Sequence, residues 1–193
     1  MITALRLCAT HRHRVRHSRN IAFAPGLNAI VGPNGTGKST VLRVLHTCPD
    51  CRIERTGNGQ TIRFHSEEDN PQTAGFAAKS PLDTLLKTRG LFASHGQIMR
   101  DVLATLPFGP GDTLLLDEPE AGQDLSWIEG IRDGLAEISE ELGVQVIMAT
   151  HHPLLWVGAH LVEFAPNYAE TIRSRYRTYL CPGVQNQRAE EPA

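Results

Sequence analysis

The sequence predicts a single α/β domain in which helices flank a mainly parallel β-sheet, with an additional antiparallel β portion. Apolar runs of strand length at 27–31, 113–117 and 144–150 predict the central strands. The first two runs are each followed by a helical pattern, and this alternation favours parallel pairing. The antiparallel portion is expected from two N-terminal strands and from a β-hairpin at 52–64.

The composition is that of one globular domain without an export signal. Of the 193 residues, 40% are apolar, so disorder is not expected. Nineteen lysines and arginines oppose 21 acidic residues, and the net charge of −2 gives no general attraction to nucleic acid. No apolar run approaches the roughly 18 residues of a membrane helix, and Arg6 interrupts the apolar N-terminus, which argues against a secretory signal. We therefore expect a cytoplasmic domain at 1–181 with reduced cysteines, followed by a flexible tail at 182–193.

A basic segment lies between the two predicted N-terminal strands, which we place at 2–8 and 20–23. In an extended chain, arginines at every second position of 11–19 would share one face. That face would suit a nucleotide, a nucleic-acid backbone or an acidic partner. The alternative, which we favour, is a charged hairpin edge exposed to solvent. The arginines concerned are Arg12, Arg14 and Arg16.

A glycine-rich loop follows the predicted strand at 27–31. Gly32, four intervening residues and then Gly37-Lys38-Ser39 match the phosphate-binding loop pattern in full. The glycines let backbone N–H groups turn toward phosphate oxygens. Lys38 can reach the β- and γ-phosphates, the Ser39 hydroxyl can bind Mg²⁺, and a helix expected from Lys38 adds its positive N-terminus. We predict that a nucleoside triphosphate binds to Gly32, Pro33, Asn34, Gly35, Thr36, Gly37, Lys38, Ser39 and Thr40.

Two cysteines follow this first helix, in the sequence Cys48-Pro49-Asp50-Cys51. Zinc would require four ligands, so Cys8, Cys181 or a distant histidine would have to complete the set. A redox pair is a second interpretation. The third, which we favour, is a turn at the end of the helix with small buried thiols.

The second half of the sequence supplies the remaining elements. The apolar strand at 113–117 ends in Asp117 and Glu118, where α/β sheets place their ligands. Apolar residues spaced by three and four predict a helix that Gly143 ends. The predicted elements here are a polar loop at 66–81, helices at 82–88, after Gly96, at 125–142 and at 169–180, and strands at 144–150 and 161–164.

Four motifs follow the phosphate loop in a fixed order. They are Ser94-His95-Gly96-Gln97, Asp117-Glu118-Pro119, Asp124 and Thr150-His151. This series resembles that of the ABC-class ATPases, with a signature loop, a Walker B aspartate and glutamate, a D-loop and a switch histidine. The Asp-Glu-Pro-Glu and Thr-His-His-Pro-Leu sequences look most like the non-transporter branch, which includes SMC- and RecF-like heads and small AAA family ATPases of bacterial operons. The resemblance implies a P-loop NTPase fold of the ABC type, with a helical subdomain reduced by the short interval from Lys38 to Ser94.

The resemblance also implies catalytic roles. Asp117 would hold Mg²⁺, and Glu118 would act as general base toward the attacking water. His151 would contact the γ-phosphate, together with Lys38. A glutamine near the metal is also implied, for which Gln72 is our choice and Gln60 the alternative.

A dimer is implied by the remaining motifs. Ser94 and Gly96 would cap the γ-phosphate of ATP bound to a second copy of the chain, and Asp124 would communicate across that dimer. No aromatic residue for stacking on adenine is evident apart from Phe23, so Arg12 or His13 is expected to contact the base.

These expectations combine into one functional hypothesis with two alternatives. We expect Mg²⁺-dependent ATP hydrolysis to drive head-to-tail dimerisation and a conformational cycle in a partner effector protein, in DNA maintenance or phage defence. Nucleic acid is a candidate partner through the basic segment. The alternatives are the nucleotide-binding subunit of an ABC transporter and a nucleotide-gated regulator with little turnover.

Overall fold

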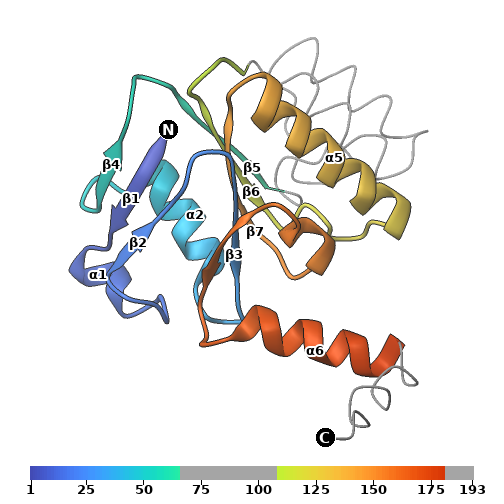
Figure 1. Ribbon diagram of the computed structural model, residues 1–193. Helices are drawn as coiled ribbons and strands as arrows, with labels where there is room; N and C mark the ends of the chain where they lie inside the picture. The colour runs from blue at the N-terminus through green and yellow to red at the C-terminus, as the bar shows by residue number, and fades with distance from the viewer. Residues whose placement is uncertain (66–107, 181–193) are drawn as a thin grey trace, which may run out of the picture.

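The structure, a computed structural model, describes residues 1–65 and 108–180. Its strands form an antiparallel sheet in the order β2-β1-β4 and a parallel sheet in the order β5-β6-β7-β3-β8 (Figure 1). The predicted fold class, a mainly parallel sheet with an antiparallel portion, is confirmed. The strands are β1 (Ile2–Arg6), β2 (Asn20–Ala22), β3 (Leu27–Val31), β4 (Arg52–Arg55), β5 (Thr61–His65), β6 (Thr113–Asp117), β7 (Gln145–Ala149) and β8 (His160–Glu163).

Three of the described helices lie where they are predicted, and two short ones, α1 (Ala9–Arg12) and the 3₁₀ helix η1 (Pro153–Trp156), are additional. The three predicted helices are α2 (Lys38–Thr47), α5 (Leu125–Glu141) and α6 (Tyr168–Leu180). Gly143, with φ at +63°, follows the last turn of α5 as predicted. None of the helices in the described ranges is long and apolar enough to cross a membrane.

Helices α2 and α5 cover opposite faces of the parallel sheet. Because side chains alternate along a strand, Leu114 and Leu116 of β6 pack in the cluster that contains α5, whereas Leu115 packs in the cluster that contains α2. Ile2 and Leu5 of the antiparallel sheet join the α2 cluster. Helix α2 therefore lies between the two sheets (Figure 1).

A buried glutamine joins the two sheets. Gln145, at the start of β7, accepts from the backbone N–H of Ile2 at 2.6 Å and donates to the Ile2 carbonyl at 2.7 Å. It also donates to the Ala24 carbonyl and accepts from the Thr113 hydroxyl. A buried amide that uses its donors and acceptor in this way is stabilising, and it fixes β1 relative to the amino ends of β6 and β7.

The predicted β-hairpin at 52–64 is wrong. Strand β4 pairs with β1, and strand β5 pairs in parallel with β6, so the two strands belong to different sheets. The Asn58-Gly59 turn signal instead marks the crossing from one sheet to the other. Gly59 lies so close to Gly111 that no Cβ would fit there. Phe64 of β5 is buried in the parallel sheet's core, which supplies the free energy that a local hairpin would lack.

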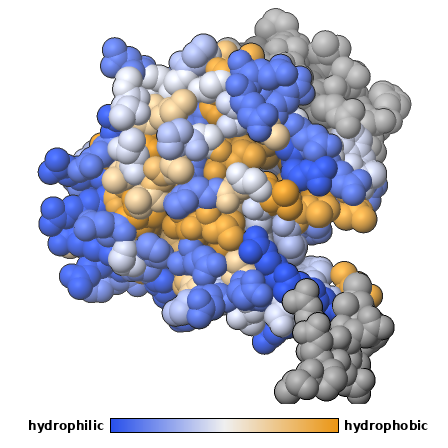
Figure 2. All heavy atoms as spheres, viewed as in Figure 1, coloured by the Kyte–Doolittle hydropathy of each residue, from blue (hydrophilic) through white to orange (hydrophobic). Residues whose placement is uncertain are grey.

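The expected exposed hairpin edge at 11–19 is right only in part: β1 and β2 pair antiparallel on either side of it and its arginines are exposed, but the segment is not an extended strand. The chain turns after β1 into α1, and the residues after it run as a loop. Arg14 and Arg16 are exposed on this loop, and Arg12 is exposed at the end of α1. Figure 2 shows hydrophilic side chains gathered on the edge of the molecule where α1 and β2 lie. Val15 is the buried residue among these arginines, and it anchors the loop to the core.

The loop at 13–16 packs directly against the phosphate loop. The Arg16 N–H donates to the Thr36 carbonyl at 2.8 Å. A Cβ added to Gly37 would lie 2.5 Å from the Arg14 carbonyl oxygen and 2.9 Å from the Val15 Cα. Gly35, in contrast, faces open space. The two glycines share a left-handed backbone, with φ of +98° at Gly37 and +73° at Gly35, but only Gly37 is also confined by a neighbouring segment.

This difference predicts unequal effects of two matched substitutions. Gly35→Ala should cost about 1–2 kcal/mol of unfolding free energy, the price of a left-handed alanine. Gly37→Ala should cost about 1–3 kcal/mol more, because the Cβ must displace the 13–16 backbone. Urea unfolding of the two variants measures the difference. Equal losses would show that the contact between the two loops is not tight.

Candidate functional site

The carboxyl ends of three parallel strands meet at one edge of the sheet. In the register of the sheet, Ala149 of β7 pairs with Asp117 of β6 on one side and with Ile30 of β3 on the other. The phosphate loop follows β3, Glu118 follows β6, and His151 lies just beyond β7. Ligands of α/β sheets bind at this edge, so the fold brings the predicted site residues of these three segments together.

Lys38 lies inside the phosphate loop. It is 5% exposed, and its Nζ donates to the Gly32 carbonyl at 3.0 Å and to the Pro33 carbonyl at 3.2 Å. Burial lowers the pKa of Lys38, and the carboxylates of Glu118 and Asp117 oppose that shift. The ammonium group is therefore held by loop carbonyls beside the acidic residues that follow β6, in a place where a phosphate would meet it.

The loop glycines serve close packing as well as phosphate approach. A Cβ on Gly32 would lie 2.8 Å from the Cβ of Phe164, which follows β8. The Thr36 hydroxyl donates to the Pro33 carbonyl at 2.8 Å and closes the loop on itself. Pro33, Asn34 and Gly35 form its exposed rim. Thr40, also predicted as a ligand residue, is half-buried in the first turn of α2.

Ser39 and Asp117 lie in contact. The Ser39 hydroxyl donates to Asp117 Oδ1 at 2.9 Å, and Asp117 is 5% exposed. A hydroxyl and a carboxylate oxygen are hard oxygen ligands of the kind that Mg²⁺ prefers. Two of the residues predicted to bind Mg²⁺, 78 positions apart in the sequence, are thus adjacent, and their donor set fits that ion.

Glu118 and His151 face one another across the ends of β6 and β7. Glu118 has a left-handed backbone with φ at +49°, and its N–H donates to the Ala149 carbonyl at 2.9 Å. Its carboxylate lies 3.7 Å from His151 Nε2, and the two side chains are 47% and 33% exposed, respectively. Burial lowers the pKa of His151, and the nearby Lys38 charge lowers it further. The carboxylates of Glu118 and Glu120 oppose this shift, and the net effect on the pKa favours the neutral imidazole, which can donate one hydrogen bond.

Glu120 has a positioning role that sequence reasoning missed. Its Oε1 accepts from the Thr150 hydroxyl at 2.8 Å and from the His151 N–H at 2.6 Å. Glu120 thereby connects the turn after β6 to the backbone of His151. The only signal for it in the sequence is the final carboxylate of Asp-Glu-Pro-Glu.

The remaining predicted residues lie in several places. Asp124 N-caps α5, where its Oδ1 accepts from the Trp127 N–H at 3.0 Å and from the Ser126 hydroxyl at 2.8 Å, and the Ser126 bond is the main cause that lowers the pKa of Asp124. Gln60 binds Asp112 at the amino end of the sheet, away from the site, so it is not the metal-linked glutamine. Gln72, Ser94 and Gly96 lie outside the described residues, as does the expected reduced helical subdomain.

The candidates for adenine contact divide in the same way. Phe23 is 6% exposed and packs in the α2 cluster, so its ring is not available for stacking. Arg12 and His13 are exposed.

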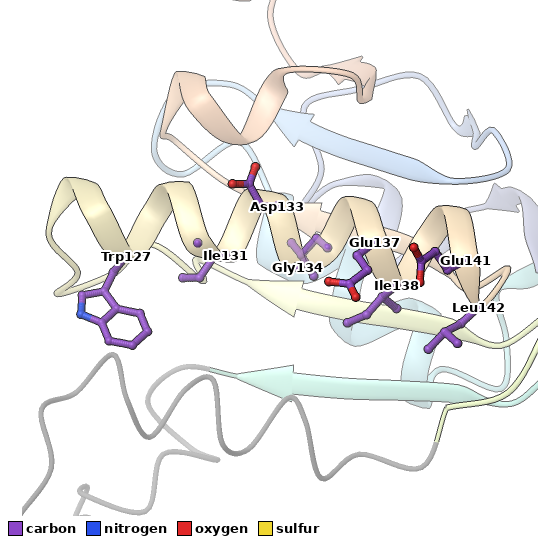
Figure 3. Close-up of a pocket in the computed structure, with 10 residues that line it drawn as sticks. Trp127, Ile131, Asp133, Gly134, Glu137, Ile138, Glu141 and Leu142 are labelled. Carbon is purple, nitrogen blue, oxygen red and sulfur yellow. The ribbon is translucent and has the colours of Figure 1, made fainter.

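A separate groove of about 500 Å³ runs along α5 (Figure 3). It is lined by Trp127, Ile138 and Leu142 together with carboxylates, among them Asp133 and Glu137. The described residues of its lining include no cation that could meet a phosphate group. The groove is therefore not the nucleotide site.

Known proteins share this combination of fold and motifs. A family model described as "AAA domain" matches residues 5–77, and one described as "AAA domain, putative AbiEii toxin, Type IV TA system" matches 100–157. The cytochrome c biogenesis ATP-binding export protein CcmA of Paramagnetospirillum magneticum is 30% identical over 183 residues, which cover 74% of this chain and 84% of that protein. The chain belongs to the ABC-type P-loop ATPases. Members of this family bind and hydrolyse ATP, and we describe the chain as an ATPase from here on.

A further relative and a solved structure are also similar to this ATPase. The zinc import ATP-binding protein ZnuC of Roseobacter denitrificans is 29% identical over 157 residues, covering 68% of this chain and 61% of the relative, so the chain spans less than two thirds of that protein. Among solved structures, cbiO1 of Clostridium perfringens, part of the ABC transporter complex cbiONQ, matches with a TM-score of 0.54 at 22% identity, covering 84% of this chain and 87% of that one. The structural likeness shows the fold. The narrower assignment to the non-transporter branch stays a prediction.

The Glu120 contacts generate a test of positioning. Glu120→Ala should lower kcat by about tenfold or more, because the His151 backbone loses its anchor, while the KM for ATP changes little. Glu120→Gln keeps an acceptor oxygen and should restore most of the rate. The readouts are steady-state ATPase kinetics and thermal melting.

The matched control is Asp112→Ala. Asp112 also accepts from backbone N–H groups, those of Gly109 and Gln60, but at the other end of the sheet. The Asp112→Ala substitution should therefore lower the stability of the protein without lowering kcat. An equal loss of kcat in both alanine variants would show that Glu120 acts through stability alone.

Proposed function

We propose that this ATPase uses Glu118 as the general base toward the attacking water and His151 as a contact to the γ-phosphate. The observation that carries the proposal is the placement of Glu118 and His151 3.7 Å apart at the same sheet edge as the phosphate loop. Glu118 is half-exposed, so its carboxylate can reach a water outside the protein core. The γ-phosphoryl group passes to that water, whose proton goes to Glu118, and ADP and phosphate leave.

Ser39 and Asp117 are the residues that would hold Mg²⁺ with the nucleotide. When bound, the ion would neutralise charge on the β- and γ-phosphate oxygens. Lys38 and the inward N–H groups of the phosphate loop orient the same oxygens. The neutral His151 then donates a hydrogen bond to the γ-phosphate without adding a charge that release of the product would have to overcome.

The site is completed, in this proposal, by a second copy of the chain bound head to tail. Glu118 and His151 remain partly exposed at the sheet edge, which leaves room for a covering group. Ser94 and Gly96 of that second copy would supply it by capping the γ-phosphate. Asp124 is the N-cap of α5, at the end of the turn that follows β6. It would lie close enough to the second copy to respond to that copy's conformational state.

Two candidate functions remain, and they differ in the partner on which the ATPase would act. The description of the family model over 100–157 names a type IV toxin–antitoxin system, which favours a chain that acts with an effector protein in DNA maintenance or phage defence. The names of the relatives concern zinc import and cytochrome c biogenesis export, which favours the subunit of a transporter. We favour the first, because Asp-Glu-Pro-Glu and Thr-His-His-Pro-Leu look most like the non-transporter branch.

The central experiment uses Glu118→Gln. This variant should bind ATP with near wild-type affinity but hydrolyse it at least about 100-fold more slowly, because the amide cannot accept the proton. The unhydrolysed ATP should hold two copies together, so size-exclusion chromatography with light scattering should show a dimer with Mg²⁺-ATP and a monomer with ADP. Adding Lys38→Ala should abolish the dimer, because the phosphates lose their buried cation.

Each outcome is decisive. Wild-type turnover in Glu118→Gln would remove the role given to Glu118. A monomer in the presence of ATP, with turnover lost, would keep that role and remove the sandwich.

The same trapped variant distinguishes the two partner classes. Cross-linked in its native cell with ATP bound, Glu118→Gln should be recovered with an effector protein in the fraction that remains after membranes are removed. The Glu118→Gln, Lys38→Ala double variant is the control, since it should recover no ATP-dependent partner. Recovery only with a multi-span membrane protein would overturn this assignment and favour the transporter subunit.

A further inference from the structure

Three cysteines and one histidine converge where α1 meets the carboxyl end of α2. The Sγ atoms of Cys8, Cys48 and Cys51 and the Nδ1 atom of His11 all lie within 4.8 Å of one another. His11 Nδ1 is 3.2 Å from the Cys8 sulfur, 3.5 Å from that of Cys48 and 3.7 Å from that of Cys51. These residues come from three places in the chain. Cys8 and His11 lie at α1, Cys48 follows α2, and Cys51 precedes β4.

We propose that Cys8, His11, Cys48 and Cys51 bind a structural zinc ion. Three thiolates and one imidazole form a complete tetrahedral set for zinc. With zinc–sulfur bonds of about 2.3 Å and a zinc–nitrogen bond of about 2.0–2.1 Å, the ligand atoms of a tetrahedron lie about 3.5–3.8 Å apart. The three distances from His11 Nδ1 are close to that spacing. The four donor atoms lie within 4.8 Å of one another, so the sulfur atoms would close by up to about 1 Å around one ion at the centre.

The surroundings favour a closed, structural site. Cys51 is 7% exposed, and the apolar cluster of α2 packs against Cys8 and Cys48. The Cys8 N–H points at the Cys51 sulfur at 3.2 Å, an outer hydrogen bond of the kind that stabilises a metal-bound thiolate.

A redox pair explains less of this geometry. A disulfide would join two of the sulfurs and leave the third sulfur and the imidazole without a role. All four donors face one another, although the chain between Cys8 and Cys51 passes through β2, β3 and α2. Convergence of four metal-binding side chains across 43 residues is the arrangement that a metal ion requires.

The proposed ion would support the nucleotide site through α1. This helix has four residues and no side-chain N-cap hydrogen bond, so it has little stability of its own. The next residues, Arg14, Val15 and Arg16, press against Gly37 and Thr36 of the phosphate loop. By tying α1 to the end of α2 and to the start of β4, the ion would hold this segment against the phosphate loop.

The test measures metal in the full-length chain purified under reducing conditions without a metal-affinity tag. Elemental analysis should find about one zinc per chain, and Cys48→Ser combined with Cys51→Ser should reduce this content to background. The matched control is Cys181→Ser, outside the described residues, which should keep the ion. Cobalt exchanged into the wild type should give the visible bands of a tetrahedral centre and a thiolate charge-transfer band, both of which His11→Ala should alter and the exposed neighbour substitution His13→Ala should not.

A chelator experiment covers the case in which the cysteine variants fail to fold. Stripping the wild-type chain should lower its melting temperature and weaken ATP binding, and an equimolar amount of zinc should restore both. Failure of the reduced chain to take up zinc or cobalt would overturn the proposal, as would a zinc content unchanged in the double serine variant. A disulfide among the three cysteines in the native protein would overturn it in favour of a redox pair. None of these outcomes depends on how ATP is hydrolysed.

Discussion

The parallel register of β3, β7 and β6 is the constraint on which the site depends. Because adjacent parallel strands end at the same edge, the phosphate loop, Asp117 and His151 meet although they are far apart in sequence. A register slip of one residue would turn Asp117 into the apolar core and Leu116 out of it. The buried leucines of β6 therefore fix the carboxylate that we propose as a Mg²⁺ ligand as firmly as they fix the fold.

The antiparallel sheet, helix α2 and the segment after α1 support this edge of the parallel sheet. Helix α2, which begins at Lys38, is packed between the parallel sheet and the antiparallel sheet, and Gln145 ties the two sheets together at their other end. The segment after α1 rests on Gly37. The phosphate loop is thus held on several sides before any nucleotide binds, so less conformational entropy is lost when the phosphates are enclosed. The proposed zinc ion would act in the same way. It would fix α1 and the segment after it, which have the least secondary structure among the parts that support the phosphate loop.

The sequence predicted those features that depend on local chemistry. The phosphate loop, the buried strands and α5 have strong periodicity or a spaced set of special residues, and the structure has them within a few residues of the predicted bounds. The predictions failed where long-range pairing competes with local signals. Asn58-Gly59 is a good hairpin turn, yet β5 pairs with β6 because Phe64 gains a buried position there. The four-residue helix α1 and the approach of His11 to Cys48 likewise depend on tertiary contacts that no spacing reveals.

The charges of the site explain why it must gather so many donors around one nucleotide. Lys38 lies in the field of Glu118, Asp117 and Glu120, three carboxylates that act on it together, and ATP would bring further negative charge. Loop N–H groups and the N-terminus of α2 offset part of this repulsion. A divalent cation between Ser39 and Asp117 would offset more, while a neutral His151 avoids competing with Lys38 for the same phosphate oxygens. Once the γ-phosphate has been cleaved, the three carboxylates again interact with Lys38 alone. The same balance of charge therefore favours release of the products. In the proposed cycle, the closed form would be stable only while the triphosphate is intact, and that is the property a nucleotide-driven switch requires.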